Sequence, residues 1–199
     1  MNIKRVCVLY FSPTGGTEKI ARLVAENLSE KLNIECTFFD ITQPKNRCNE
    51  YHFSEDDLVV MASPVYAGRL PNKLVPEYRA KIWGEGTPAV PICVFGNRSP
   101  DESLRELMIL MEDNGFSIVG AAAFAGRHAF SDQIGAKRPD ENDLDEIADF
   151  TSKVVQKLTD HRKMFLKIDH SELGHYYSSP KEDGTPAKFL NTRLYTDSN

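Results

Sequence analysis

The sequence lacks the features of a membrane-bound or secreted protein. No apolar run approaches the roughly 20 residues that a membrane-spanning helix requires. Residues 1–5 lead directly into a strand-like apolar run, without the hydrophobic region and small-residue cleavage site of a secretory signal. We therefore expect a cytoplasmic protein that does not contact a membrane.

Cysteine is scarce and widely spaced. Cys7, Cys36, Cys48 and Cys93 include no Cys-x-x-Cys pair, the spacing typical of zinc and iron–sulfur ligands. Cys7 and Cys93 lie inside apolar runs, and free cysteine is among the most buried residue types. The pattern predicts free thiols and no metal site.

Positive charge is also in deficit, with 24 Lys and Arg against 29 Asp and Glu and a net charge of −5. Nucleic acids and anionic membranes favour proteins with basic patches, so we expect neither as a partner. A basic protein partner matches this charge better. The composition gives no indication of the oligomeric state.

The remaining composition is that of a globular protein, with 199 residues, 41% hydrophobic and 27% charged. This length suits one domain with a short appendage. After residue 158 the pattern changes, and Pro180–Pro186 has the turn-rich, charged composition of a linker. We expect a domain over residues 1–162 and a C-terminal extension or connector over residues 163–199.

Apolar runs of strand length alternate with amphipathic stretches along the expected domain. The expected strands are 6–11, 34–41, 58–62, 92–95 and 118–124, and the expected helices are 17–32, 72–82, 99–114 and 143–158. Continuously apolar strands are typical of parallel sheets covered on both faces. Pro88 and Pro91 should lie at the start of the fourth strand, because proline inside a central strand removes a ladder hydrogen bond. The pattern predicts an α/β fold with a doubly wound five-stranded parallel sheet.

The loop after the first expected strand is suited to a phosphate group. Ser12–Thr17 contains three hydroxyls and two glycines and leads straight into a helix, whose N-terminus favours anions. A Walker loop is excluded because Gly16 is followed by Thr17 and Glu18, and the pattern G-x-G-x-x-G is absent. The alternative is a turn rich in serine, threonine and glycine that only caps the helix.

Three loops together resemble those of the flavodoxin family. The first matches the signature T/S-x-T-G-x-T, the second (63–71) resembles the loop that lines the flavin ring, and Phe95–Arg98 resembles the Y/F-G-N-R loop on its other side. They follow strands one, three and four, which meet at the switch point of a sheet with strand order 2-1-3-4-5. The resemblance therefore implies a flavodoxin-like fold with that order and flavin mononucleotide (FMN) as cofactor.

The resemblance also implies the residues that bind FMN. They are Ser12, Thr14, Gly15, Gly16 and Thr17 around the phosphate, and Pro64, Val65, Tyr66, Ala67, Gly68, Gly96, Asn97 and Arg98 around the ring. No catalytic residue is implied.

Several of these residues have a second interpretation. Tyr66 either stacks on the ring or is a surface tyrosine. Gly68 either allows a peptide flip toward flavin N5, as the resemblance implies, or is a turn glycine. Asn97 and Arg98 present donors or positive charge to the ring, unless Arg98 is only a solvated cation.

The chain departs from the family where relatives carry an aromatic residue shortly after Gly-Asn-Arg. Residues 99–101 are Ser-Pro-Asp, so no stacking ring is expected there, and flavin affinity should be weaker than in a typical flavodoxin. The loop 126–131 could fold over the site with His128 as a titratable donor. A structural histidine in a connecting loop is the alternative for His128.

The C-terminal residues resemble a narrower group, flavodoxin-like domains that precede a ferredoxin domain with two 4Fe–4S clusters. Tyr176, Tyr177 and residues 180–190 look like the connector in that group. The resemblance implies an electron-transfer flavoprotein whose partner is an iron–sulfur redox protein or domain, in a fusion or a relative that lost its clusters. The alternatives are an FMN-dependent NAD(P)H:quinone-type oxidoreductase and a flavin-free interaction domain.

Overall fold

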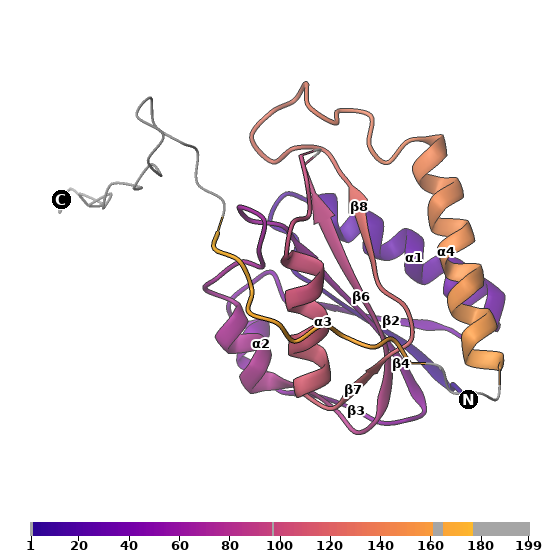
Figure 1. The fold of residues 1–199 in the computed structure, drawn as a ribbon. Helices are drawn as coiled ribbons and strands as arrows, with labels where there is room; N and C mark the ends of the chain where they lie inside the picture. Colours follow the sequence, from indigo (N-terminus) through magenta and orange to yellow (C-terminus); the bar gives the residue numbers. More distant parts are fainter. Residues whose placement is uncertain (1, 97, 161–164, 177–199) are drawn as a thin grey trace.

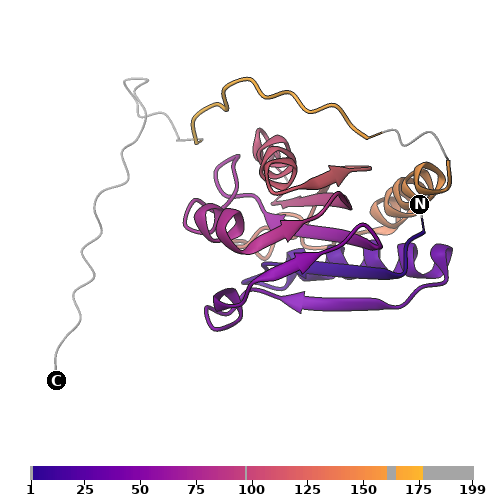
Figure 2. The same cartoon turned by 90° about the horizontal axis from the view of Figure 1, so that it is seen from below.

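The computed structural model describes residues 2–96, 98–160 and 165–176. The chain forms an open parallel sheet with helices on both faces (Figures 1 and 2). The strands of this sheet are β1 (Arg5–Tyr10), β2 (Cys36–Asp40), β4 (Asp57–Pro64), β6 (Thr87–Phe95), β7 (Phe116–Ile118) and β8 (Ala122–Ala125). The helices are α1 (Gly16–Leu32), α2 (Val75–Lys81), α3 (Ser103–Asp113) and α4 (Glu141–Thr159).

The strand order is β2-β1-β4-β6, with β7 and β8 both pairing with β6, and every pairing is parallel. The predicted doubly wound sheet and its order 2-1-3-4-5 are therefore confirmed. Three short elements were not predicted: the 3₁₀ turn η1 (Asn46–Cys48) and the strands β3 (Tyr51–Phe53) and β5 (Ile82–Gly84), which pair as a separate small sheet.

The expected fifth strand, 118–124, was wrong as one continuous element. It is divided into β7 and β8, which pair with β6 in registers that differ by one residue: Ala89 faces Ile118, whereas Ile92 faces Ala122. Residues 119–121 therefore lie opposite only Val90 and Pro91, in the manner of a β-bulge.

Pro88 lies at the start of the strand as expected, but the position expected for Pro91 was wrong, because β6 begins at Thr87 and Pro91 is inside it. Alternate residues of a parallel strand direct their amide groups to the same neighbour. Ala89 O accepts from Val119 N at 3.0 Å, so the nitrogen of Pro91 faces the same side, at the break between β7 and β8. Pro88 precedes the first residue of β6 that pairs with β4. A central strand tolerates these prolines because neither occupies a position where the ladder needs its N–H.

The helices bury both faces of the sheet, which explains the continuously apolar strands. Val6 and Val8 of β1 pack in one core cluster with residues of α1 and α4, whereas Cys7 and Leu9 pack in a second cluster with residues of α2 and α3. Among the described residues, no helix is both long enough and apolar enough to cross a membrane.

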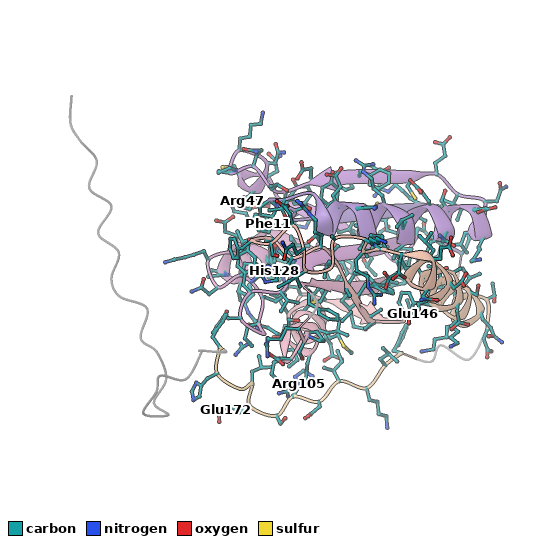
Figure 3. All side chains as sticks on the ribbon, turned by 90° about the horizontal axis from the view of Figure 1, so that it is seen from above. Phe11, Arg47, Arg105, His128, Glu146 and Glu172 are labelled. Carbon is teal, nitrogen blue, oxygen red and sulfur yellow. The ribbon has the colours of Figure 1, made fainter. Side chains whose placement is uncertain are left out.

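An extended segment, residues 165–176, lies beside α3 and is called the strap below (Figures 1 and 2). Leu166 N donates to Ile118 O at 2.8 Å, and Leu166 and Ile168 pack against the second core cluster. The side chain of Arg105 donates to the backbone oxygens of Asp169, Ser171 and Glu172 at 3.3, 2.9 and 3.3 Å (Figure 3). The expected domain boundary after residue 162 lies outside the described residues.

The free cysteines should differ in reactivity. Burial raises the pKa of Cys7 to about 11 and that of Cys93 to about 12, and both side chains are inaccessible, whereas Cys48 is exposed. Because the thiolate is the nucleophile, we expect iodoacetamide at pH 8 to label Cys48 first and to leave Cys7 and Cys93 unmodified. Peptide mass mapping over time checks this, with urea-unfolded protein as the fully labelled control. Rapid labelling of Cys93 in the native protein would contradict it.

Candidate functional site

The carboxyl ends of four strands surround a cavity of about 470 Å³. This volume is within the range of about 300–1,000 Å³ typical of small-molecule sites, and the strand order changes direction there. The lining residues follow β1, β4, β6 and β8 or end these strands: Pro13, Thr14, Gly16, Thr17, Pro64, Val65, Tyr66, Ala67, Val94, Phe95, Gly96, Arg127, His128, Ala129 and Phe130.

The loop after β1 is shaped by its own hydrogen bonds. Ser12 Oγ accepts from Glu18 N at 2.9 Å, and Ser12 N donates to Thr42 Oγ1 at 2.9 Å. Gly15 N donates to Ser12 O at 3.3 Å, with Gly15 in the left-handed region at φ 79°. These bonds fix the shape of the loop. Ser12 is buried and shapes the loop from behind the cavity rather than lining it.

This loop directs donors into the cavity. The N–H groups of Gly16 and Thr17 have no carbonyl to bind within α1, because a helix leaves its first N–H groups without a partner. Both residues line the cavity together with Thr14. A Cβ added at Gly15 or Gly16 would meet no atom within 4 Å, so a ligand can approach the backbone closely. The arrangement is suited to an anion such as a phosphate.

The loop after β4 forms a tight turn at the second side of the cavity. Tyr66 and Arg69 exchange backbone hydrogen bonds of 2.9 and 3.1 Å, and Ala67 and Gly68 between them have φ of 50° and 79°, as in a type I′ turn. Tyr66 lines the cavity with 44% of its surface exposed. Partial burial raises the pKa of the Tyr66 phenol, so the ring remains neutral at physiological pH.

Gly68 lies behind the turn rather than on the cavity wall. Its carbonyl accepts from Glu102 N at 3.0 Å, at the start of α3. A Cβ added at Gly68 would lie 2.3 Å from Asp101 Oδ2. A flip of the Gly68 peptide would therefore have to break the bond to Glu102, and the flip remains one of the two interpretations that the sequence left open for Gly68.

A buried ion pair fixes this turn to the rest of the protein. Arg69 donates to both carboxylate oxygens of Glu106 on α3, with Nε–Oε2 and Nη2–Oε1 distances of 2.9 and 2.7 Å. Glu106 Oε2 also accepts from Leu70 N at 2.8 Å. Arg69 further donates to Gly174 O at 2.5 Å, and its guanidinium lies 5.1 Å from the centre of the Tyr176 ring. The turn, α3 and the strap thus meet at one charge pair.

The loop after β6 contributes less to the wall than expected. Gly96 lines the cavity, whereas the side chain of Arg98 forms an ion pair with Asp101 and is not among the lining residues. Asn97 lies outside the described residues.

The loop after β8 forms a wall that the predicted contact set did not include. Arg127, His128, Ala129 and Phe130 all line the cavity, and His128 is on the loop that the sequence pattern suggested could fold over the site (Figure 3). Pro13, Val94 and Phe95 are further lining residues missing from that set. The place of this loop in the chain could have indicated its role, because every loop at the carboxyl edge of a parallel sheet lies near the switch point.

The structure thus brings most of the predicted contact residues to one cavity. Those that line it are Thr14, Gly16, Thr17, Pro64, Val65, Tyr66, Ala67 and Gly96. Ser12, Gly15, Gly68 and Arg98 belong to the same loops without lining the cavity. Whether these residues contact FMN stays a prediction.

These features define a doubly wound α/β protein with a cofactor-sized cavity at its switch point. More specifically, the chain belongs to the flavodoxin domain family, whose model matches residues 7–107. No curated protein matches the chain.

Solved structures share the fold. The flavodoxin of Streptococcus pneumoniae TIGR4 is 18% identical, with a TM-score of 0.53 over 77% of this chain and 99% of its own. Oxidised flavodoxin 2 of Bacillus cereus is 15% identical, with a TM-score of 0.52 over 77% of this chain and 99% of its own. The rubredoxin oxygen:oxidoreductase of Desulfovibrio gigas is 16% identical, with a TM-score of 0.52 over 79% of this chain but 37% of its own.

Breaking the Arg69–Glu106 pair should destabilise the fold strongly. Glu106→Gln leaves the guanidinium buried without its anion, and we expect the free energy of unfolding to fall by about 3–5 kcal/mol. Urea unfolding followed by the fluorescence of Trp83, the only tryptophan, measures the change.

Two further variants serve as controls for Glu106→Gln. Asp113→Asn removes an exposed partner of Arg79, at 2.9 Å, and should change stability by less than about 1 kcal/mol. The double variant Arg69→Met with Glu106→Leu removes both charges and should lose less than Glu106→Gln. Equal unfolding midpoints for Glu106→Gln and the wild type would contradict the assigned role of the pair.

Proposed function

We propose that the chain binds FMN in this cavity and functions as an electron-transfer flavoprotein. The observation that carries the proposal is one cavity that joins a helix N-terminus suited to a phosphate with a region walled by Tyr66, Phe95 and Gly96. A phosphorylated cofactor with a flat, largely apolar ring matches both ends. When bound, the flavin supplies the redox chemistry, and the protein supplies binding, orientation and electrostatics.

At the phosphate end, the hydroxyls of Thr14 and Thr17 and the N–H groups of Gly16 and Thr17 would donate to the phosphate oxygens. Ser12 keeps the loop in shape through its bond with Glu18 N. No lysine or arginine of the described chain lines the cavity on this loop, so the donors are hydroxyls, N–H groups and the helix dipole. Such a site should bind a phosphate monoester by hydrogen bonds rather than by ion pairs.

At the ring end, Tyr66 would contact one side of the isoalloxazine. A neutral tyrosine offers apolar area and an offset aromatic contact worth about 0.5–1.5 kcal/mol beyond burial. The turn that carries Tyr66 is connected through Arg69 to the buried Glu106. The packed core therefore sets the position of the Tyr66 side chain. Gly96 lines the cavity at the end of β6.

The proposed redox partner is an iron–sulfur protein or domain, and the chain is the flavodoxin part of a ferredoxin fusion or of a relative. Two observations support this proposal: residues 180–190 resemble a connector, and Tyr176 Oη donates to Leu70 O at 2.9 Å, so the strap passes beside the turn at the cavity. The free thiols of all four cysteines support a reducing, cytoplasmic location. Steady NAD(P)H oxidation by the FMN-loaded protein with a quinone would instead indicate an oxidoreductase.

FMN should stabilise the folded protein. A ligand that binds only the native state, present at 100 times its Kd, raises the free energy of unfolding by about 2.7 kcal/mol. Urea unfolding with and without FMN measures this, with lumiflavin, which lacks the ribityl phosphate, for comparison. An unfolding curve that FMN at millimolar concentration does not shift would contradict the proposed function.

The phosphate loop should discriminate FMN from riboflavin. Thr14→Val and Thr17→Val each remove a donor to a charged group, worth about 1.5–3 kcal/mol, so each should weaken FMN binding by about 10- to 150-fold. Riboflavin, which has no phosphate, should lose little affinity. Fluorescence titration of both flavins measures the difference, and Thr37→Val on the exposed face of β2 is the matched control. Equal losses for the two flavins would contradict a phosphate role for the loop.

A further inference from the structure

We propose that Phe130, on the loop after β8, covers the flavin ring on the side away from Tyr66, and that His128 positions it. The inference rests on the proposed FMN function and assigns the second aromatic contact of that site. Phe130 lines the cavity, yet 95% of its surface is exposed. A large apolar side chain exposed at the edge of a cavity gains free energy when a flat apolar ligand covers it.

The strand order puts the two rings on opposite sides. β4 and β8 both pair with β6, on its two edges. Tyr66 follows β4 and Phe130 follows β8, while Phe95 and Gly96 at the end of β6 lie between them. A planar group above the end of β6 is therefore flanked by one aromatic side chain from each neighbouring strand. Each of these residues lines the same cavity.

The two ends of the loop that carries Phe130 lie close together. A Cβ added at Gly135 would lie 2.7 Å from Gly126 O, so the two ends of the loop are in contact. Within the loop, His128 N donates to Ile134 O at 3.0 Å, and Arg127 pairs with Asp132 at 2.6 Å. These features are those of a compact surface loop whose ends lie close together. Phe130 thus has a defined backbone position despite its exposed side chain.

His128 connects this loop to the cavity. Phe130 N donates to His128 Nδ1 at 3.2 Å, and the two rings lie 6.0 Å apart in an edge-to-face arrangement. A Cβ added at Gly96 would lie 2.7 Å from His128 Cδ2, so the imidazole packs where Gly96 has no side chain. His128 therefore packs against Gly96 at the end of β6 and fixes the backbone position of Phe130.

Phe130→Ala should weaken FMN and riboflavin by the same factor, about tenfold, because the ring that both flavins share loses a stacking partner. This result differs from that of Thr14→Val, which should affect FMN alone. The fluorescence of the bound flavin should also rise, because stacking on an aromatic side chain quenches it. Phe130→Trp should restore the affinity for both flavins.

Phe165→Ala is the matched control, since Phe165 is also exposed, at 41%, but lies at the start of the strap and not on the cavity. It should leave both affinities unchanged. Gly96→Ala tests the positioning role: it should displace His128 and weaken both flavins, with the emission spectrum of Trp83 reporting that the fold is retained.

The possible results distinguish a failure of the role proposed for Phe130 from a failure of the proposed FMN binding. Wild-type protein that binds FMN while Phe130→Ala binds both flavins with unchanged affinity would overturn the role of Phe130 and leave the proposed function intact. Loss of FMN affinity alone would also overturn it, because the effect would then lie at the phosphate. Wild-type protein that binds neither flavin would overturn both.

Discussion

The carboxylate of Glu106 is the point at which separate parts of the molecule are joined. The Glu106 side chain is 7% exposed, and its carboxylate accepts hydrogen bonds from Nε and Nη2 of Arg69 and from the N–H of Leu70. Removing two charges from water is unfavourable unless the geometry of the pair is good and their other hydrogen-bonding groups have partners. Here those requirements are met by Arg69, by Leu70 and, for the remaining arm of Arg69, by Gly174 O. The turn after β4 and the helix α3 thus meet at this carboxylate, and the strap is joined to them through the bond from Arg69 to Gly174 O.

The consequence for the site is that its two ends are fixed by different means. The loop after β1 is fixed by a bond between Ser12 and Glu18, six residues later, and by a bond from Ser12 to Thr42, which follows the neighbouring strand β2. The turn that carries Tyr66 depends on a residue 40 positions later, Glu106, and so on the docking of α3. The phosphate end thus depends on α1 and on the neighbouring strand β2, whereas the ring end depends on the docking of α3.

The central strand β6 shows where local preference and tertiary context diverge. Proline is unfavourable inside a central strand, and on that ground β6 should begin after Pro91. In the structure Pro91 is inside β6, because the neighbouring strand is interrupted by residues 119–121 at the position that its missing N–H would face. No property of Pro91 or of its own strand reveals that interruption, which belongs to a segment almost 30 residues later.

Patterns of residues along the chain were sufficient to predict the doubly wound parallel sheet, its strand order and the loop suited to phosphate. The sheet and the loop follow from short-range information, namely apolar runs covered on both faces and hydroxyls and glycines before a helix, whereas the strand order was implied by the resemblance of three loops to those of flavodoxins. Tertiary structure alone decided that Ser12 shapes the loop from behind, that Gly68 bonds to α3 and that Phe130 shares a cavity with Tyr66. These facts depend on which strands lie next to β6 and on what Glu106 binds, and such contacts join residues too far apart for any local pattern to record.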